Sequence, residues 1–136
     1  MKKEQLKRIF DFLKDKENKN KPFKWKLVNN EPLTEEELYF NPNLDLKNKN
    51  ITSLPEGLHI GGFLVLRNTK ITSLPKGLKV NEWLGLEDSK VSLLPKGLEV
   101  GGNLYIKGTP LSENYTNDEI REMIKPGFIK GLINRS

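Results

Sequence analysis

Residues 44–63 read LDLKNKNITSLPEGLHIGGF, and the pattern returns at residues 64–83 as LVLRNTKITSLPKGLKVNEW and at residues 84–103 as LGLEDSKVSLLPKGLEVGGN. A truncated fourth copy, LYIKGTPLSE, follows at residues 104–113. A fixed period of this kind is typical of a solenoid, in which each repeat forms one coil and stacks on the next. The repeat therefore decides the fold, and the flanking segments are expected to close it at both ends.

Six apolar columns recur in the full repeats, and we predict that they form the core. The pairs Leu44/Leu46 and Leu58/Ile60 follow a two-residue period, which is typical of strands with one buried face. Equivalent strands of successive coils should pair in parallel, about 4.8 Å apart. In the central repeat the predicted core consists of Leu64, Leu66, Ile71, Leu74, Leu78 and Val80.

Two sharp changes of direction are expected between the strands of each repeat. The residue before a proline favours extended backbone, so Leu54-Pro55 predicts an extended corner. Gly57 follows two residues later, where a glycine permits a tight corner. Each repeat is thus expected to be one closed coil.

The N-terminal flank is predicted to be a cap. Leu6, Ile9, Phe10 and Leu13 follow helical spacing within residues 3–16, which predicts an amphipathic helix. Phe23, Trp25 and Leu27 alternate with lysines, which predicts a strand. Thr34 with Glu37 forms a capping-box pattern, and we expect it to open a short helix that continues to about Leu38.

The C-terminal flank repeats the capping signal. Thr116 with Glu119 predicts the start of a second helix, which Pro126-Gly127 should end. A last strand is expected from Phe128 to Ile133.

These elements predict one domain over residues 1–136, with an N-terminal cap at 1–43, a solenoid at 44–112 and a C-terminal cap at 113–136. The fold class is a predominantly β repeat solenoid with helical caps at both ends. Its coils are either leucine-rich-repeat-like or arranged as a two-sheeted parallel β-solenoid.

Composition excludes several classes of function. The chain has no cysteine, which rules out disulfides, thiolate metal sites and a cysteine nucleophile. We see no apolar stretch long enough for a signal peptide or a membrane span, so we expect a cytoplasmic protein with no membrane partner.

The positive charge is concentrated at the N-terminus. Residues 1–30 carry ten Lys or Arg against four Asp or Glu, a net charge of 10 − 4 = +6. A solvated lysine-rich face explains this run of charge. The alternative is a nucleic-acid-binding segment, because basic residues beside an aromatic ring such as Trp25 can engage single strands. The candidate residues for that alternative are Lys19, Lys21, Lys24 and Lys26.

The outward positions of the L-x-L strand form the candidate protein-binding site, since inward positions are committed to packing. Aromatic residues at its centre with charged residues around them match the composition of an interface. The alternative is that a terminal cap covers Phe63 and Trp83 as core. The predicted site consists of Phe63, Val65, Arg67, Trp83, Glu87, Tyr105 and Lys107.

Enzyme signatures are missing from the pattern. His59 has no partner column that would make a ligand set, and Gly61-Gly62 lies at a repeat corner rather than at the start of a helix. The acidic run at residues 35–37 suits the first turn of a helix. We therefore expect a noncatalytic protein with no cofactor and no metal.

The motif L-x-L-x-x-(N/T)-x-I-T-S-L-P resembles the leucine-rich repeat, in particular its twenty-residue bacterial form, over residues 44–112. The whole chain is also similar to small bacterial and phage proteins built from I-T-S-L-P-x-G-L-x-V-G-G units. It departs from the leucine-rich repeat where that motif has asparagine, because Thr69, Ser89 and Thr109 stand there instead. Their hydroxyl groups can still hold a turn.

The resemblance implies a noncatalytic protein-binding scaffold. It further implies a phage or mobile-element protein that binds and inhibits or modulates a host factor, such as a defence effector, in an anti-CRISPR-like manner. The expected partner is a host protein or ribonucleoprotein complex. The alternative function is nucleic-acid binding through the basic N-terminal region.

Overall fold

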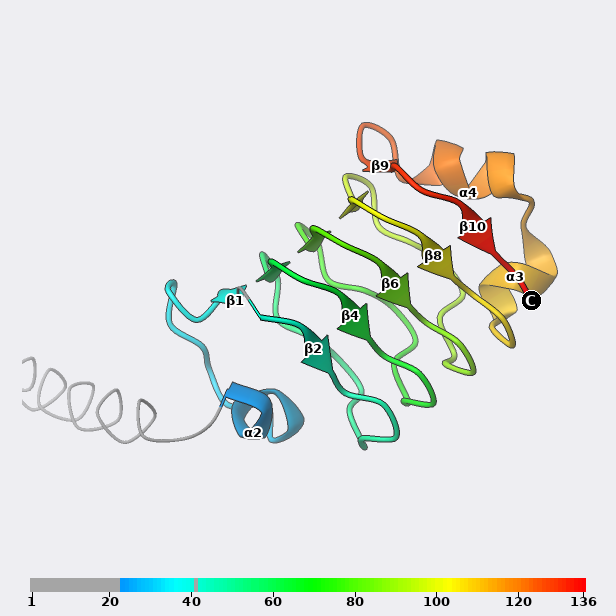
Figure 1. The fold of residues 1–136 in the computed structure, drawn as a ribbon. Helices are drawn as coiled ribbons and strands as arrows, with labels where there is room; N and C mark the ends of the chain where they lie inside the picture. Colours follow the sequence, from blue (N-terminus) through cyan, green and yellow to red (C-terminus); the bar gives the residue numbers. More distant parts are fainter. Residues whose placement is uncertain (1–22, 41) are drawn as a thin grey trace, which may run out of the picture. The chain divides into compact units, whose positions relative to one another are not determined.

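The computed structural model describes residues 23–40 and 42–136. The chain divides into two compact units, residues 1–32 and residues 33–136. The second unit is a parallel β-solenoid built from two five-stranded sheets, sheet A and sheet B (Figure 1). The two-sheeted form of the predicted solenoid is therefore confirmed.

The two sheets alternate along the chain, so that each full coil gives one strand to each. Sheet A has the strand order β1 (Tyr39–Phe40), β3 (His59–Ile60), β5 (Lys79–Val80), β7 (Glu99–Val100) and β9 (Phe128–Ile129). Sheet B consists of β2 (Leu44–Asp45), β4 (Leu64–Val65), β6 (Leu84–Gly85), β8 (Leu104–Tyr105) and β10 (Ile133–Asn134). Every pair is parallel, and Leu64 pairs with Leu84 one repeat further on.

The core lies between the two sheets and is filled by the repeat's apolar columns. In the central coil Leu64, Leu66, Ile71 and Leu78 are 0% exposed, and Val80 and Leu74 are 2% and 6% exposed. All six predicted core residues are thus buried. Identical columns stack because the register equals the repeat length.

Each coil turns at two positions with left-handed backbone. Gly57, Gly77 and Gly97 have φ angles of +77°, +77° and +87°, as expected for the tight corner after Leu-Pro. At the other corner, Asn48, Asn68 and Asp88 adopt φ angles of +62°, +53° and +58°. Asn and Asp tolerate this conformation better than other side chains, and this corner is a feature that was not predicted.

The C-terminal end begins with two short helices (Figure 1). α3 (Pro110–Asn114) was not predicted, and its N-cap Thr109 accepts a hydrogen bond from the Ser112 amide. α4 (Asn117–Met123) starts with the predicted capping box of Thr116 and Glu119. It also ends before Pro126-Gly127, as expected.

The predicted single strand over residues 128–133 is wrong. β9 and β10 are separate, because the chain crosses from sheet A to sheet B between Ile129 and Ile133. The same crossing joins Ile60 to Leu64 in an earlier coil.

Two further predictions on the N-terminal side are corrected. Residues 23–27 belong to a helix, α2 (Phe23–Val28), rather than a strand, and its buried residues Lys26 and Leu27 are adjacent instead of alternating. Thr34 and Glu37 exchange the predicted capping-box hydrogen bonds, but the predicted helix is wrong: residues 35–38 form only a turn, which leads into β1 at Tyr39. The predicted helix at residues 3–16 lies outside the described residues.

Candidate protein-binding face on sheet B

Three aromatic side chains at the neighbouring strands β4, β6 and β8 form one row on the outward side of sheet B. The rings of Phe63 and Trp83 stack with centroids 4.4 Å apart and an interplanar angle of 16°. Trp83 and Tyr105 meet edge to face at 5.6 Å and 86°. All three side chains are half-buried. We call Phe63, Trp83 and Tyr105 the aromatic row; the structure brings together the three rings that the sequence analysis singled out.

The remaining residues of the predicted site surround the aromatic row. Val65 is half-buried in β4, where its register partner in β6 is Gly85. Arg67 and Lys107 are exposed. Glu87, in the coil between these two cations, is half-buried.

Gly85 lies beneath two of these side chains. A Cβ atom added to Gly85 would lie 2.7 Å from Glu87 Oε1 and 3.2 Å from the Trp83 ring. Because real Cβ atoms almost never approach that closely, the bare backbone at this position is what lets Trp83 and Glu87 lie on the sheet. Gly85 was not among the residues of the predicted site.

Asparagines shape the corner that leads into the aromatic row. Asn43 Oδ1 accepts a hydrogen bond from the Phe63 amide at 3.0 Å, and Asn103 Oδ1 accepts one from the Leu132 amide at 2.9 Å. Asn103 Nδ2 also lies 3.3 Å from the Tyr105 hydroxyl. The bonds of Asn43 to Phe63 and of Asn103 to Leu132 each tie one coil to the next, whereas the contact of Asn103 with Tyr105 lies within one coil. Their signal in the sequence is asparagine at the repeat position that Phe63 and Trp83 occupy in other coils.

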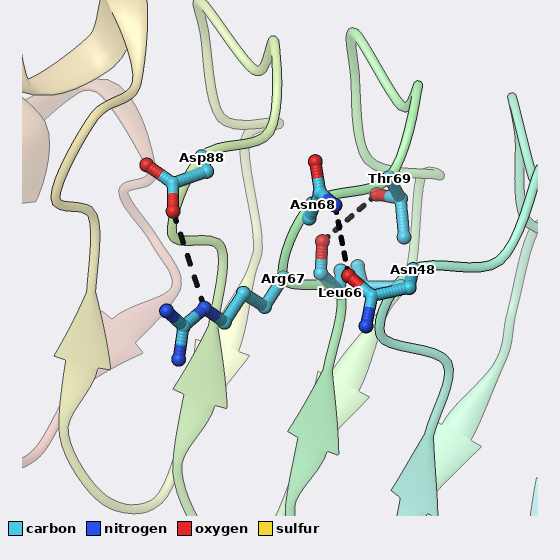
Figure 2. A network of polar contacts seen from close by, with 6 residues as sticks. All are labelled: Asn48, Leu66, Arg67, Asn68, Thr69 and Asp88. Atoms are coloured by element: carbon cyan, nitrogen blue, oxygen red, sulfur yellow. Dashed lines mark hydrogen bonds and ion pairs between the residues drawn. The ribbon is translucent and has the colours of Figure 1, made fainter.

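A polar network lies just beyond the face, at the left-handed corner (Figure 2). Asn68 Nδ2 donates to Asn48 Oδ1 at 2.8 Å, and Thr69 Oγ1 donates to the Leu66 carbonyl at 2.8 Å. Arg67 Nε lies 4.0 Å from Asp88 Oδ2. The expected hydroxyl-to-backbone bond is present at Thr69 and also at Thr109, whereas the buried Ser89 hydroxyl has no partner among the described residues.

The outward side of sheet A differs in that its polar groups are matched with one another. His59 Nε2 lies 2.9 Å from Asn81 Oδ1, and the His59 ring is 5.4 Å from that of Tyr39. Lys79 Nζ pairs with Glu99 Oε2 at 3.3 Å. These pairs between neighbouring strands leave fewer polar groups without a partner on sheet A than on the outward face of sheet B.

The basic segment that could bind nucleic acid is described only in part. Lys19 and Lys21 lie outside the described residues. In α2, Lys26 is fully buried, whereas Lys24 and Trp25 are exposed. The nucleic-acid alternative stays a prediction.

No group of three or more His, Asp or Glu side chains gathers as a potential metal site in residues 23–40 and 42–136. Within the same part of the chain, none of the helices has the length and apolar character needed to cross a membrane. Comparisons with protein-family models, with curated proteins and with solved structures find no match to this chain.

Proposed function

We propose that this protein is a noncatalytic protein-interaction module that binds its partner through the aromatic row. The observation that carries the proposal is the stacking of Phe63, Trp83 and Tyr105 into one half-exposed row. Tryptophan and tyrosine are enriched among the residues that dominate interface energies. Side chains already held in one arrangement also lose little conformational entropy when a partner binds.

The scaffold and the rim support the same function. Each strand beneath the row is hydrogen-bonded to strands of neighbouring coils, which makes sheet B a rigid support. The exposed cations Arg67 and Lys107 border the row, in keeping with the polar rim of protein interfaces.

The proposed partner is a host factor, such as a defence effector, either alone or within a ribonucleoprotein complex. This part of the proposal is supported by the resemblance of the repeats to small bacterial and phage proteins. The protein would act in the host cytoplasm by occupying a surface of its partner, without a chemical step.

Affinity capture from host lysate with matched variants tests the proposal. Trp83→Ala or Tyr105→Ala should weaken binding of a captured partner by about 1–2 kcal/mol, roughly tenfold, while the melting temperature stays nearly unchanged. His59→Ala on sheet A is the control and should keep full affinity. A loss of several kcal/mol of stability in Trp83→Ala would identify this residue as core and contradict the proposal.

A further inference from the structure

A carboxylate with an unpaired oxygen lies with Trp83 over Gly85, at the aromatic row. Glu87 Oε1 is buried against the bare backbone of Gly85 and accepts no hydrogen bond from any described residue. Buried polar atoms in folded proteins almost always have a partner. This oxygen is therefore a hydrogen-bond acceptor without a donor inside the proposed interface.

The cations next to Glu87 do not neutralise it. Arg67 and Lys107 occupy the equivalent position in the two adjacent coils, but no described residue forms an ion pair with Glu87. Arg67 instead points toward Asp88, with Nε 4.0 Å from Oδ2 (Figure 2). Glu87 thus adds an unpaired negative charge to an aromatic surface.

We propose that Glu87 and the aromatic row form the subsite for an arginine side chain of the protein partner, an inference that rests on the proposed function. A guanidinium group stacks on aromatic rings and pairs with a carboxylate through two parallel hydrogen bonds. Tryptophan, tyrosine and arginine are also the residues most often found at the energetic centre of interfaces. The aromatic row supplies the rings, and Glu87 supplies the carboxylate, that a guanidinium group binds.

Binding requires one local movement. Because Glu87 Oε1 is covered in the unbound protein, its carboxyl group must turn away from Gly85 to meet a guanidinium. Side-chain rotamer changes of this kind are common at interfaces whose backbone stays fixed. The Glu87 oxygen, which has no donor in the unbound protein, then accepts a charge-assisted hydrogen bond from the guanidinium group.

The charge of the neighbouring Lys107 predicts the direction in which the affinity for arginine should change. Lys107 is exposed beside Glu87 and repels an incoming cation. Neutralising Glu87 should therefore weaken the binding of arginine, whereas neutralising Lys107 should strengthen it. If Glu87 only filled space, its neutralisation would leave the affinity for arginine unchanged.

The test uses the full chain labelled with ¹⁵N and titrated with N-acetyl-arginine amide. The Trp83 indole and Gly85 amide signals should shift saturably, and more strongly than with N-acetyl-lysine amide or N-acetyl-glutamate amide. Glu87→Gln should weaken binding at least about threefold, and Lys107→Gln should strengthen it about twofold. Equal affinity of the native chain and Glu87→Gln, equal binding of the lysine probe, or no saturable shift up to about 50 mM would overturn the arginine subsite.

The capture experiment separates this inference from the proposed function. If Trp83→Ala loses the partner while Glu87→Gln retains it fully, the interface stands and the arginine subsite falls. If both variants lose the partner and both keep the native melting temperature, both proposals are supported.

Discussion

The Arg121 guanidinium donates to the Ile129 carbonyl, where a main-chain amide of a further coil would otherwise donate. Its Nη1 donates to the Ile129 carbonyl at 2.5 Å, and its Nη2 donates to the Gly131 carbonyl at 2.8 Å. In the preceding coil the equivalent carbonyls, those of Val100 and Gly102, accept from main-chain amides of the next coil. One guanidinium group thus satisfies the two acceptors that the last coil would otherwise leave open.

We expect Arg121→Met to lower the free energy of unfolding by about 1.5–3 kcal/mol, the usual range for hydrogen bonds to a charged group. Arg121→Lys keeps the charge but not the two-pronged geometry, so its loss should be smaller. Urea denaturation measures both changes. Identical midpoints for Arg121→Met and the native chain would show that solvent serves these carbonyls equally well.

Asp88→Asn should stabilise the left-handed corner. Asn68 already donates to Asn48, but a carboxylate at position 88 cannot donate to Asn68 in turn. The amide would extend the ladder by one hydrogen bond, worth about 0.5–1.5 kcal/mol. The weak exposed pair with Arg67, at 4.0 Å, is lost in exchange.

Thermal melts at low and high salt check the Asp88 prediction. The gain should be larger at high salt, because screening removes the contribution of Arg67 from the native chain. A lower melting temperature at both salt concentrations would contradict it.

Thr69 and Ser89 occupy the same repeat position but should respond differently to loss of the hydroxyl. Thr69→Val keeps the side-chain shape and removes the bond to the Leu66 carbonyl, which should cost about 1 kcal/mol. Ser89→Ala removes a buried hydroxyl without a partner among the described residues and should be neutral or stabilising. Parallel urea titrations compare the two variants, and equal losses would show that Ser89 finds a partner in solution.

Gly85→Ala should disturb the aromatic row without removing a ring. The new Cβ would meet Glu87 Oε1 at 2.7 Å and the Trp83 ring at 3.2 Å, so both side chains must move. We expect a change in near-ultraviolet circular dichroism and a loss of partner affinity of about tenfold. Lys79→Ala, an exposed position in β5 of sheet A, is the control for a substitution on the other sheet, and an unchanged aromatic spectrum in Gly85→Ala would argue against this packing.

The repeat was informative because one local pattern recurs in register. Alternating leucines predicted two strands for each coil, and the equal spacing of Leu64 and Leu84 predicted their parallel pairing, which the structure has. The same alternation failed at residues 23–27, where it occurs once. A single short alternation has no repeated neighbour to pair with, so local helical hydrogen bonds prevail there.

The candidate site was predictable in its members but not in its interactions. Phe63 and Trp83 occupy the same repeat position, and Tyr105 lies one outward position further along, where it pairs with Gly85. Because the register equals the period, these positions had to come onto one face. That Glu87 turns toward Gly85 rather than toward Arg67 or Lys107 has no sign in the sequence. It depends on the space that the Trp83 ring leaves above Gly85.

The amino-acid sequence by itself determined the coil, the core columns, the glycine corners and the start of α4, since each depends on residues close together in the chain or on a pattern repeated at a constant distance. Only the tertiary structure decided how the solenoid ends at Arg121 and how the aromatic row packs. Those features depend on contacts between side chains and backbone groups of different coils. Such contacts exist only after the coils have stacked.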